Sequence, residues 1–589
     1  MRCFVVDMSA APDQSPLARL LSKLDSRGLA PSAWLRTGWP RVVPLTMLAA
    51  LPLALAGPIR YVTGVGSVLA FVLAVAVTVA SVLPFAQALR APAGSRRDAL
   101  LANAVCVAVA TFAVWLLYNG DFGGLASFIA RDGMMAIDAA SHVRQYHDFI
   151  DRTPQVYEGF VSLYGFWDPL RRVTGDLIVP IKLSFYLGVV VVAVAPCVIT
   201  FSVLHKFRAE RRAYVVGGVV CLVSSIAVQY WLILPLESFH HMGGFWAHLF
   251  ALVPLVALWL VDALVRQRIL RVVAIGFIAV LYRYTYGLNV PDLCAAIGVI
   301  LVAEACGHQL PRRTRVMLGF MALAAFAGSL YSYLQLRPIF SVWGWILRHD
   351  IARVRQGEVL ALLAIGVTCA WRPIRALASG SGIVRALRFP FVFGAANVLF
   401  LVVVKYTTPT NIHYYSQKYD FHAVVLVASS FVVVASFWAA TCARQFDRRT
   451  LSGLVIALAL VAVGQQRLRR GFAVYQEGFR EHALGAPPYH RPQPWYDAAA
   501  IERIRETLRI EHKAFGGYAS PLWPMRCFMN ALFDHGDLKD PQLTTAPGHC
   551  VFWEAGEAAA QDADPAKRCS AHPRRWSPTG TATLCSRCY

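Results

Sequence analysis

The fold of this chain is constrained most by long, nearly charge-free apolar runs that recur between residues 42 and 465. A run of about 20 such residues, wound as a helix, matches the thickness of the hydrocarbon layer of a bilayer. Apolar residues make up 57% of the chain and charged residues only 15%, so a water-soluble fold of this size would lack the polar side chains that its surface needs. The sequence therefore predicts an integral membrane protein.

Thirteen apolar runs, each bounded by charged residues, proline or glycine, are candidate transmembrane helices. They lie near 42–59, 65–88, 99–118, 176–204, 213–236, 248–264, 272–287, 291–306, 316–334, 358–371, 389–404, 421–441 and 451–465. We therefore predict an all-α polytopic membrane domain of about 13 helices over residues 42–465. Residues 1–41 are predicted to form an N-terminal tail, and residues 466–589 a small C-terminal extracytoplasmic domain.

The net charge of +22 arises mainly from arginines in short segments between alternate apolar runs, such as "HKFRAERRA" at 205–213 and "HQLPRRTR" at 308–315. Because basic loops stay on the cytoplasmic side, this pattern places the tail at 1–41 in the cytoplasm. The odd number of spans then places residues 466–589 in the periplasm. A nucleic-acid-binding protein would gather its basic residues on one soluble surface, so no nucleic-acid partner is expected.

The segments on the opposite side are longer and richer in aromatic, histidine and acidic residues. They cover residues 119–175, 237–248, 336–358 and 405–420. By the same rule these segments face the periplasm. Polar chemistry is therefore predicted to converge on the periplasmic face of the membrane.

The stretch "GMMAIDAASHVRQYHDF", residues 133–149, is the most polar part of the first outer loop and has the pattern of a helix. Asp138 and His142 are four residues apart and share one helix face. One interpretation is a solvated helix with an ion pair worth a few tenths of a kcal/mol. The other is an active-site rim, where a carboxylate beneath aromatic loops acts as a general base. Asp132 lies just before this helix.

The stretch "VVVKYTTPTNIHYYSQKYDFHAVVL", residues 402–426, offers a second polar group at a membrane surface. Lys405, His413, Tyr414 and Lys418 could hold a phosphate whose lipid tail lies in the bilayer, with Arg144 from the first loop as a further cation. Snorkelling lysines in an aromatic belt are the alternative interpretation.

Three residues of the second outer loop, Glu237, His240 and His241, are candidate acceptor contacts. Two adjacent histidines cannot easily face one ion from a helix, which disfavours a metal there. A divalent cation, Mg²⁺ or Mn²⁺, is compatible with Asp132, Asp138 and His142, but their spacing does not require it.

The C-terminal segment contains an expected amphipathic helix, "DAAAIERIRETLRIEH", and five of the 13 cysteines. An oxidising compartment makes a Cys527–Cys550 disulfide a candidate, although connectivity cannot be derived from sequence. The terminal "CSRCY" has the spacing of half a zinc site, but a second pair of ligands is not evident.

Together, the many spans, the acidic outer loop and the extracytoplasmic C-terminal segment resemble the GT-C superfamily of integral-membrane glycosyltransferases. "DAASH" at 138–142 is similar to the Asp-containing loop motif of that superfamily, although it follows the third apolar run here instead of the first. Lys405 followed by "HYY" is similar to the late Lys…His-Tyr segment of the aminoarabinose and mannosyl branches. "YYSQK" at 414–418 is similar to a segment of the arabinofuranosyltransferase branch.

The resemblance implies a multi-pass enzyme of the bacterial inner (cell) membrane that uses a polyprenyl-phosphate sugar, with decaprenyl-phosphate arabinose as the implied donor. Asp138 would be the catalytic base of an inverting transfer to a glycan, lipid or protein acceptor. A lipid-phosphate donor carries its own activation, so no nucleotide site is required.

Other functions remain compatible with the sequence. A transporter or flippase of lipid-linked sugars would need charged residues near the bilayer midplane and broken helices. A polymerase or ligase of envelope polysaccharides would use arginines in one large outer loop, and residues 336–358 supply four. A non-enzymatic assembly role for the C-terminal segment would leave the acidic residues of the loops dispensable.

Overall fold

The computed structural model describes most of the membrane part and of the C-terminal segment. The described residues are 52, 54–88, 96–120, 129–130, 135–151, 158–175, 177–207, 209–233, 246–265, 267–306, 310–342, 382–407, 413–445, 493–494, 498–519, 523–533, 543–555, 567–573 and 581–589. The predicted tail at 1–41, residues 42–51 and 53 of the first predicted span, and the predicted spans near 358–371 and 451–465 lie outside these residues.

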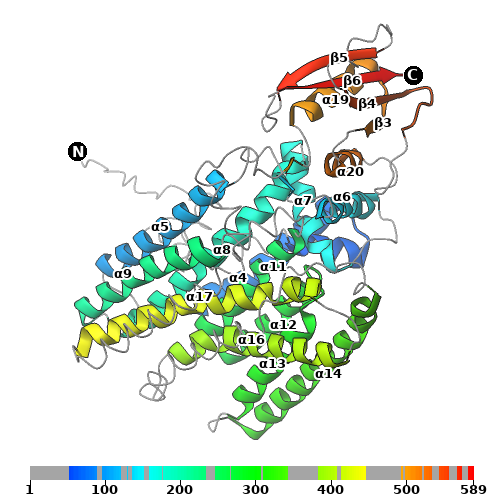
Figure 1. Ribbon diagram of the computed structural model, residues 1–589. Helices are drawn as coiled ribbons and strands as arrows, with labels where there is room; N and C mark the ends of the chain where they lie inside the picture. The colour runs from blue at the N-terminus through cyan, green and yellow to red at the C-terminus, as the bar shows by residue number, and fades with distance from the viewer. Residues whose placement is uncertain are drawn as a thin grey trace, which may run out of the picture.

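Helices dominate the described structure (Figure 1). A helix over 54–63 is followed by α4 (Ser67–Ala88), α5 (Arg96–Gly120), α6 (Met135–Asp151), η2 (Glu158–Phe160), α7 (Val161–Thr174), α8 (Ile178–Leu204), η3 (His205–Phe207), α9 (Arg211–Val228), η4 (Gln229–Ile233), α11 (Trp246–Leu264), α12 (Arg268–Arg283), α13 (Val290–Ala305), α14 (Arg312–Val342), α16 (Gly382–Thr407), α17 (His413–Gln445), α19 (Ala498–Glu511) and α20 (Trp523–Leu532). The predicted helices in the first outer loop and after residue 496 are confirmed as α6 and α19.

Six helices among the described residues are long and apolar enough to cross a membrane. They are Ile178–Leu204, Arg211–Val228, Trp246–Leu264, Arg312–Leu336, Gly382–Phe400 and Phe421–Arg444. Four other predicted spans correspond to α4, α5, α12 and α13, with 22, 25, 16 and 16 residues. A helix of 16 residues is about 24 Å long, less than the hydrocarbon layer. The six long apolar helices and the predominance of helix show that the protein is mostly helical and membrane-associated.

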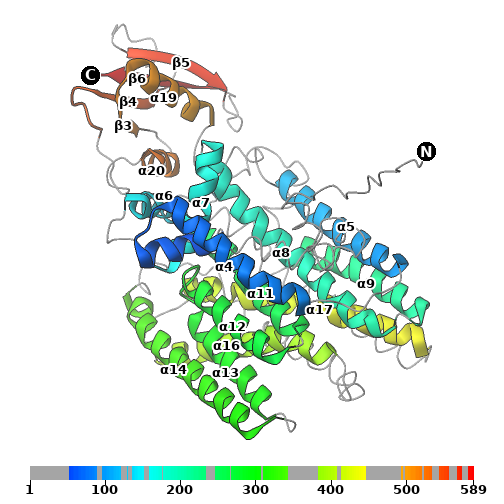
Figure 2. The same cartoon turned by 180° about the vertical axis from the view of Figure 1, so that it is seen from behind.

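The long helices form one bundle (Figures 1 and 2). Helix α17 packs along α8 and α9, while α13 packs against α14 and α16. Helix α11 lies between these groups and is buried along almost its whole length. Its side chains are therefore fixed by neighbours on every side.

Two glycine pairings set the closest helix contacts. A Cβ atom on Gly188 of α8 would lie 2.6 Å from the main-chain oxygen of Leu249 in α11. A Cβ atom on Gly165 of α7 would clash with the main-chain nitrogen of Gly57. Small residues let helix backbones approach this closely. The second crossing brings the helix over 54–63 onto α7.

A buried ionic network joins four helices at one end of the bundle, which we name the Arg388 end. Arg388 at the start of α16 contacts Asp262 at the end of α11, and its Nη1 lies 2.8 Å from Oε1 of Glu304 in α13. Nη2 of Arg271 in α12 lies 2.6 Å from the same Glu304 oxygen. Nε of Arg268 lies 2.9 Å from Glu304 Oε2. Each carboxylate is nearly or fully buried, so its cationic partners offset its desolvation.

Segments that are rich in arginine lie together at the Arg388 end. Arg268 and Arg271 belong to the basic segment 265–271, and Arg388 to the segment 371–390. Arg444 Nε lies 3.0 Å from Glu210 Oε1, which joins two further basic segments. Four of the predicted basic segments therefore meet in two pairs.

Replacing Arg388 with alanine is expected to lower the free energy of unfolding by about 3–5 kcal/mol, because two buried carboxylates lose a partner. The Arg444→Ala variant, whose ion pair is exposed on both sides, is expected to lose less than about 1 kcal/mol. Denaturant titration of the purified protein in detergent measures both values. Equal losses in the two variants would show that the network does not stabilise the bundle.

The C-terminal segment forms a four-stranded sheet that the sequence did not predict. Its strands are β3 (Ala514–Ala519), β4 (His549–Ala555), β5 (Lys567–Pro573) and β6 (Thr581–Cys588), in the order β3-β4-β6-β5. Strands β3 and β4 are parallel and the other pairs are antiparallel. A separate short pairing joins β1 (Ile129–Ala130) to β2 (Gln493–Pro494).

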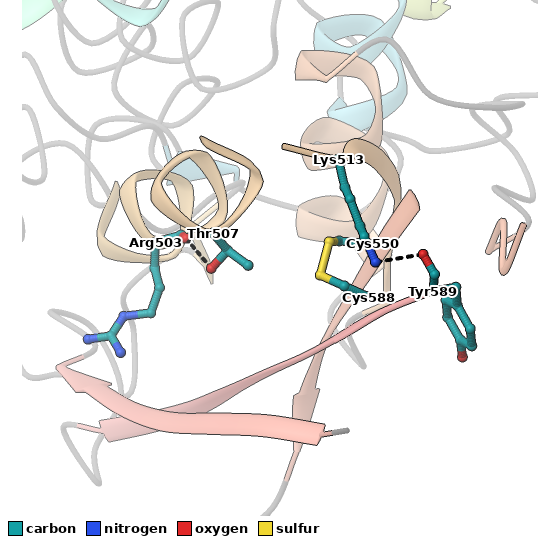
Figure 3. The surroundings of a disulfide bond; sticks show 6 residues. All are labelled: Arg503, Thr507, Lys513, Cys550, Cys588 and Tyr589. Carbon is teal, nitrogen blue, oxygen red and sulfur yellow. Dashed lines mark hydrogen bonds between the residues drawn. A yellow bond between two sulfur atoms is a disulfide. The ribbon is translucent and has the colours of Figure 1, made fainter. Parts of the chain in front are cut away.

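The disulfide in this sheet corrects the sequence-based prediction. Cys550 is bonded to Cys588, its register partner on β6, and not to Cys527 (Figure 3). Cys585 is also disulfide-bonded and lies opposite Cys569 in the register of β5 and β6. The prediction was wrong because pairing depends on strand order, which spacing along the chain does not reveal.

Peptide mapping without reduction is expected to recover a cross-link between the peptides of Cys550 and Cys588. The bond closes a loop over a sequence separation of 38, so the Cys588→Ser variant is expected to lose roughly 3–4 kcal/mol of stability. Denaturant titration with and without a reducing agent checks this value. Recovery of a Cys527–Cys550 cross-link would contradict the sheet register.

Candidate functional site

Several polar and aromatic elements converge at the end of the bundle opposite to Arg388, which we name the α6 end. Helix α6 lies there between the bundle and the C-terminal sheet (Figures 1 and 2). Helix α20 packs on α6, and the ring of Phe528 in α20 lies 6.4 Å from that of Trp246 at the start of α11. The first outer loop and the C-terminal segment, far apart in sequence, thus meet.

His142 is buried in this region and is not part of a solvated helix face. The residue is 7% exposed, and its Nδ1 lies 3.2 Å from the hydroxyl of Tyr164 in α7. Its ring lies 4.6 Å from the ring of Phe160 and 6.1 Å from that of Trp246, between centroids. Burial of Val143 and Tyr146 on the same helix anchors α6 and fixes the imidazole.

The position of Asp138 agrees with the predicted pairing on α6, since its main chain is helical one turn before His142. Its side chain and the whole of Asp132 lie outside the described part of the structure, so their catalytic roles stay predictions. Nε of Arg144 lies 4.0 Å from Oδ1 of Asp148 on the same helix. The positive charge of Arg144 is therefore shared with a carboxylate.

Asp168 in α7 is a buried carboxylate that the sequence analysis did not single out. It is 4% exposed and accepts hydrogen bonds of 3.4 Å from the Tyr146 hydroxyl and from Arg172 Nε. Arg60 Nη1 lies 3.6 Å from Asp168 Oδ2, and Arg60 Nη2 donates to the main-chain oxygen of Ile150 at 2.7 Å. The signal in the sequence was "FWDPLRR" at 166–172, which places the acid four residues before Arg172.

The phenol of Tyr146 connects this carboxylate to α6. Burial raises the pKa of Tyr146 to about 12, although the hydrogen bond from Arg171 opposes this shift. Burial also raises the pKa of Tyr164 well above its usual value. Both phenols therefore remain protonated near neutral pH and act as hydrogen-bond donors in fixed positions.

A chain of aromatic ring contacts leads from His142 into the bundle. The ring of Phe160, which contacts His142, lies 6.5 Å from that of Tyr286. The ring of Tyr286 lies 4.0 Å from that of His248, which lies 4.9 Å from that of His422. Helices α6, α11 and α17 are thus joined by packed rings at the α6 end.

These rings end at a buried polar network formed by α12, α13, α16 and α17. Asp292 accepts hydrogen bonds from the side-chain amides of Asn397 at 2.8 Å and Asn289 at 3.2 Å. His422 Nδ1 lies 3.0 Å from the Tyr282 hydroxyl and 3.2 Å from Asn289 Oδ1. All five residues are at most 1% exposed. Sequence reasoning missed them because spacing along the chain does not show that residues of four different helices meet.

The four residues predicted to bind a donor phosphate lie on two helices beside this network. Lys405 is in α16, eight residues after Asn397. His413, Tyr414 and Lys418 are in the first turns of α17. Tyr414, Lys418 and His422 follow one another at intervals of four, so these positions share one helix face. The structure describes only the main chain there, and phosphate binding stays a prediction.

Glu237, His240 and His241 lie outside the described residues. Within the part that the structure describes, no group of three His, Cys, Asp or Glu residues could hold a metal ion. A divalent cation at Asp132, Asp138 and His142 stays a prediction, because two of these side chains are not described.

No family model matches the sequence, and comparisons with curated proteins and with solved structures gave no match.

The Asn397→Ala variant is expected to lower stability by about 1–3 kcal/mol, because Asp292 keeps its burial but loses a donor. A double-mutant cycle with Asp292→Asn is expected to give a coupling energy of about 0.5 kcal/mol or more. Thermal and denaturant unfolding in detergent measure both quantities. Additive losses would show that the two side chains do not interact.

Proposed function

We propose that this protein is a membrane glycosyltransferase that takes a sugar from a polyprenyl-phosphate donor and transfers it to an acceptor of the cell envelope. In this proposal the α6 end faces the periplasm of a bacterial inner membrane, and the C-terminal sheet is a periplasmic domain of a GT-C-like enzyme. Arabinofuranose is the proposed sugar, and the acceptor is a glycan, a lipid or a protein.

The observation that carries the proposal is the position of α6 between the apolar bundle and the C-terminal sheet. A lipid-borne sugar would approach such a site from the bilayer, and a water-borne acceptor from the side of the sheet. Support for an oxidising, extracytoplasmic location comes from the disulfide between Cys550 and Cys588, because such bonds persist in that environment. The separation of the arginine-rich segments at the other end supports the same orientation.

The proposed chemistry is an inverting displacement. Asp138 accepts the proton of an acceptor hydroxyl while that oxygen forms a bond to the anomeric carbon, and the bond from this carbon to the phosphate oxygen breaks. The lipid phosphate leaves with the electron pair and a negative charge. His142, held by Tyr164, positions the base.

The departing phosphate requires positive charge and hydrogen-bond donors. In the proposal these groups are Lys405 and Lys418, with His413 and Tyr414 beside them and Arg144 from α6. Glu237, His240 and His241 contact the acceptor. A divalent cation near Asp132 and Asp138 would lower the negative charge at the reaction centre.

The Asp138→Asn variant is expected to lose sugar transfer by roughly a hundredfold or more, since the general base is removed. The matched control is Asp151→Asn, an exposed acid at the end of the same helix, which should stay within about twofold of wild type. Transfer is measured with purified full-length protein, a panel of polyprenyl-phosphate sugars and envelope extracts as acceptor, and folding is checked by thermal unfolding. Equal activity in the two variants would exclude Asp138 as the base.

A transporter or flippase of lipid-linked sugars is the second candidate, because Asp292 is a carboxylate buried within the helix bundle. Such groups in membrane helices often mark transport pathways. In proteoliposomes with the same labelled donors, a flippase would move the donor between leaflets without an acceptor and would depend on Asp292. Transfer that depends on Asp138 would favour the enzyme.

A further inference from the structure

The α6 end carries a group of cations that the proposed reaction does not use. Arg60 and Arg172 form ion pairs with the carboxylate of Asp168. The Tyr146 hydroxyl donates a hydrogen bond to this carboxylate and accepts one from Arg171. Guanidinium groups gathered in this way favour an anionic ligand, and we name Arg60, Arg171, Arg172 and Asp168 the arginine cluster.

Burial separates the arginine cluster into a supporting and an accessible part. The side chains of Arg60 and Asp168 are 9% and 6% exposed, whereas that of Arg172 is 55% exposed. Arg171 lies over the ring of Tyr146, with Cζ 5.7 Å from the centroid. Arg60 and Asp168 thus hold the cluster in place, while Arg172 reaches the surface.

Exposed valines lie close in sequence to the residues of the arginine cluster. Val173, which follows Arg172, is 86% exposed, and Val62, close to Arg60, is 66% exposed. Val68 is 67% exposed and follows Ser67, which accepts a hydrogen bond from Arg60. In a membrane-associated protein such side chains face lipid tails. Guanidinium groups bordered by exposed valines provide what a phosphate with attached hydrocarbon chains requires.

The dipole of helix α7 explains only part of this arrangement. Cations in the last turn of a helix stabilise its dipole, which explains Arg171 and Arg172 as helix-terminal residues. That effect does not explain why Arg60 is brought from another helix to the same carboxylate. Nor does it explain the exposed valines on both segments.

We propose that Arg171 and Arg172 bind the phosphate group of a membrane lipid at the α6 end, with Arg60 and Asp168 as positioning residues. The planar guanidinium fork matches two phosphate oxygens at once. The hydrocarbon chains of the lipid lie against Val62, Val68 and Val173. The site is distinct from Lys405 and Lys418, and its existence does not depend on the proposed sugar transfer.

The test is native mass spectrometry of the delipidated full-length protein in a neutral detergent. Four probes are titrated, namely phosphatidylglycerol, decaprenyl phosphate, diacylglycerol without phosphate and inorganic phosphate. Wild type is expected to bind at least one lipid phosphate more tightly than diacylglycerol and inorganic phosphate. The Arg171→Gln/Arg172→Gln variant is expected to bind that lipid phosphate about tenfold more weakly.

The matched control is Arg211→Gln/Arg212→Gln, which removes two adjacent, exposed arginines at the start of α9. It is expected to bind lipid phosphate as wild type does. An Arg171→Lys/Arg172→Lys variant keeps the charge and serves if the glutamine variant does not fold; its affinity should fall in part, because lysine lacks the planar fork.

Loss confined to phosphatidylglycerol identifies a structural lipid site, and loss confined to decaprenyl phosphate identifies a site for the lipid carrier. Either result supports the proposal. Unchanged binding in the Arg171/Arg172 variants, equal loss in the Arg211/Arg212 control, or equal binding of diacylglycerol and phosphatidylglycerol would overturn it. Inorganic phosphate that binds as tightly as the lipids would also overturn it.

Discussion

The helix bundle depends on the partners of its buried carboxylates. Asp262 and Glu304 share guanidinium groups at the Arg388 end, Asp168 is held by Arg60 and Arg172 at the α6 end, and Asp292 is held by two amides between them. A hydrocarbon layer offers no water to solvate such groups, so each must find an ion pair or a hydrogen bond within the protein. Because the partners come from different helices, this requirement selects which helices lie side by side. Apolar packing then fills the space around them.

Part of this architecture follows from the sequence alone. The apolar runs predicted helices that the structure contains, and the absence of proline and glycine after residue 134 predicted α6. Periodicity reports local structure and burial, and α6 shows both. Basic segments that the sequence predicted on one side of the membrane meet in two pairs. Each of these features depends on residues that are close together in the sequence. A short stretch of sequence is therefore enough to predict it.

The remainder depends on contacts between distant residues. Asp168 lies 108 positions after Arg60 in the chain, and neither segment indicates by its sequence that the two residues form an ion pair. Asp292 accepts hydrogen bonds from Asn289, three residues before it, and from Asn397 in another apolar run, where a single Asn is inconspicuous. The Cys550–Cys588 bond follows from strand order. Which distant residues pair depends on how the helices and strands are arranged. A single sequence does not give that arrangement, so several pairings remain compatible with it.

The order of strands in the C-terminal sheet has a consequence for how the protein is made. Strand β6 follows both β4 and β5 in the chain, yet it lies between them in the sheet. Neither of these strands can complete its hydrogen bonds, and Cys550 cannot reach its partner, until β6 has left the ribosome and joined them. The sheet therefore cannot close progressively during elongation as the helices of the bundle can. Closure of the sheet over α6 thus depends on β6, the strand that joins β4 to β5.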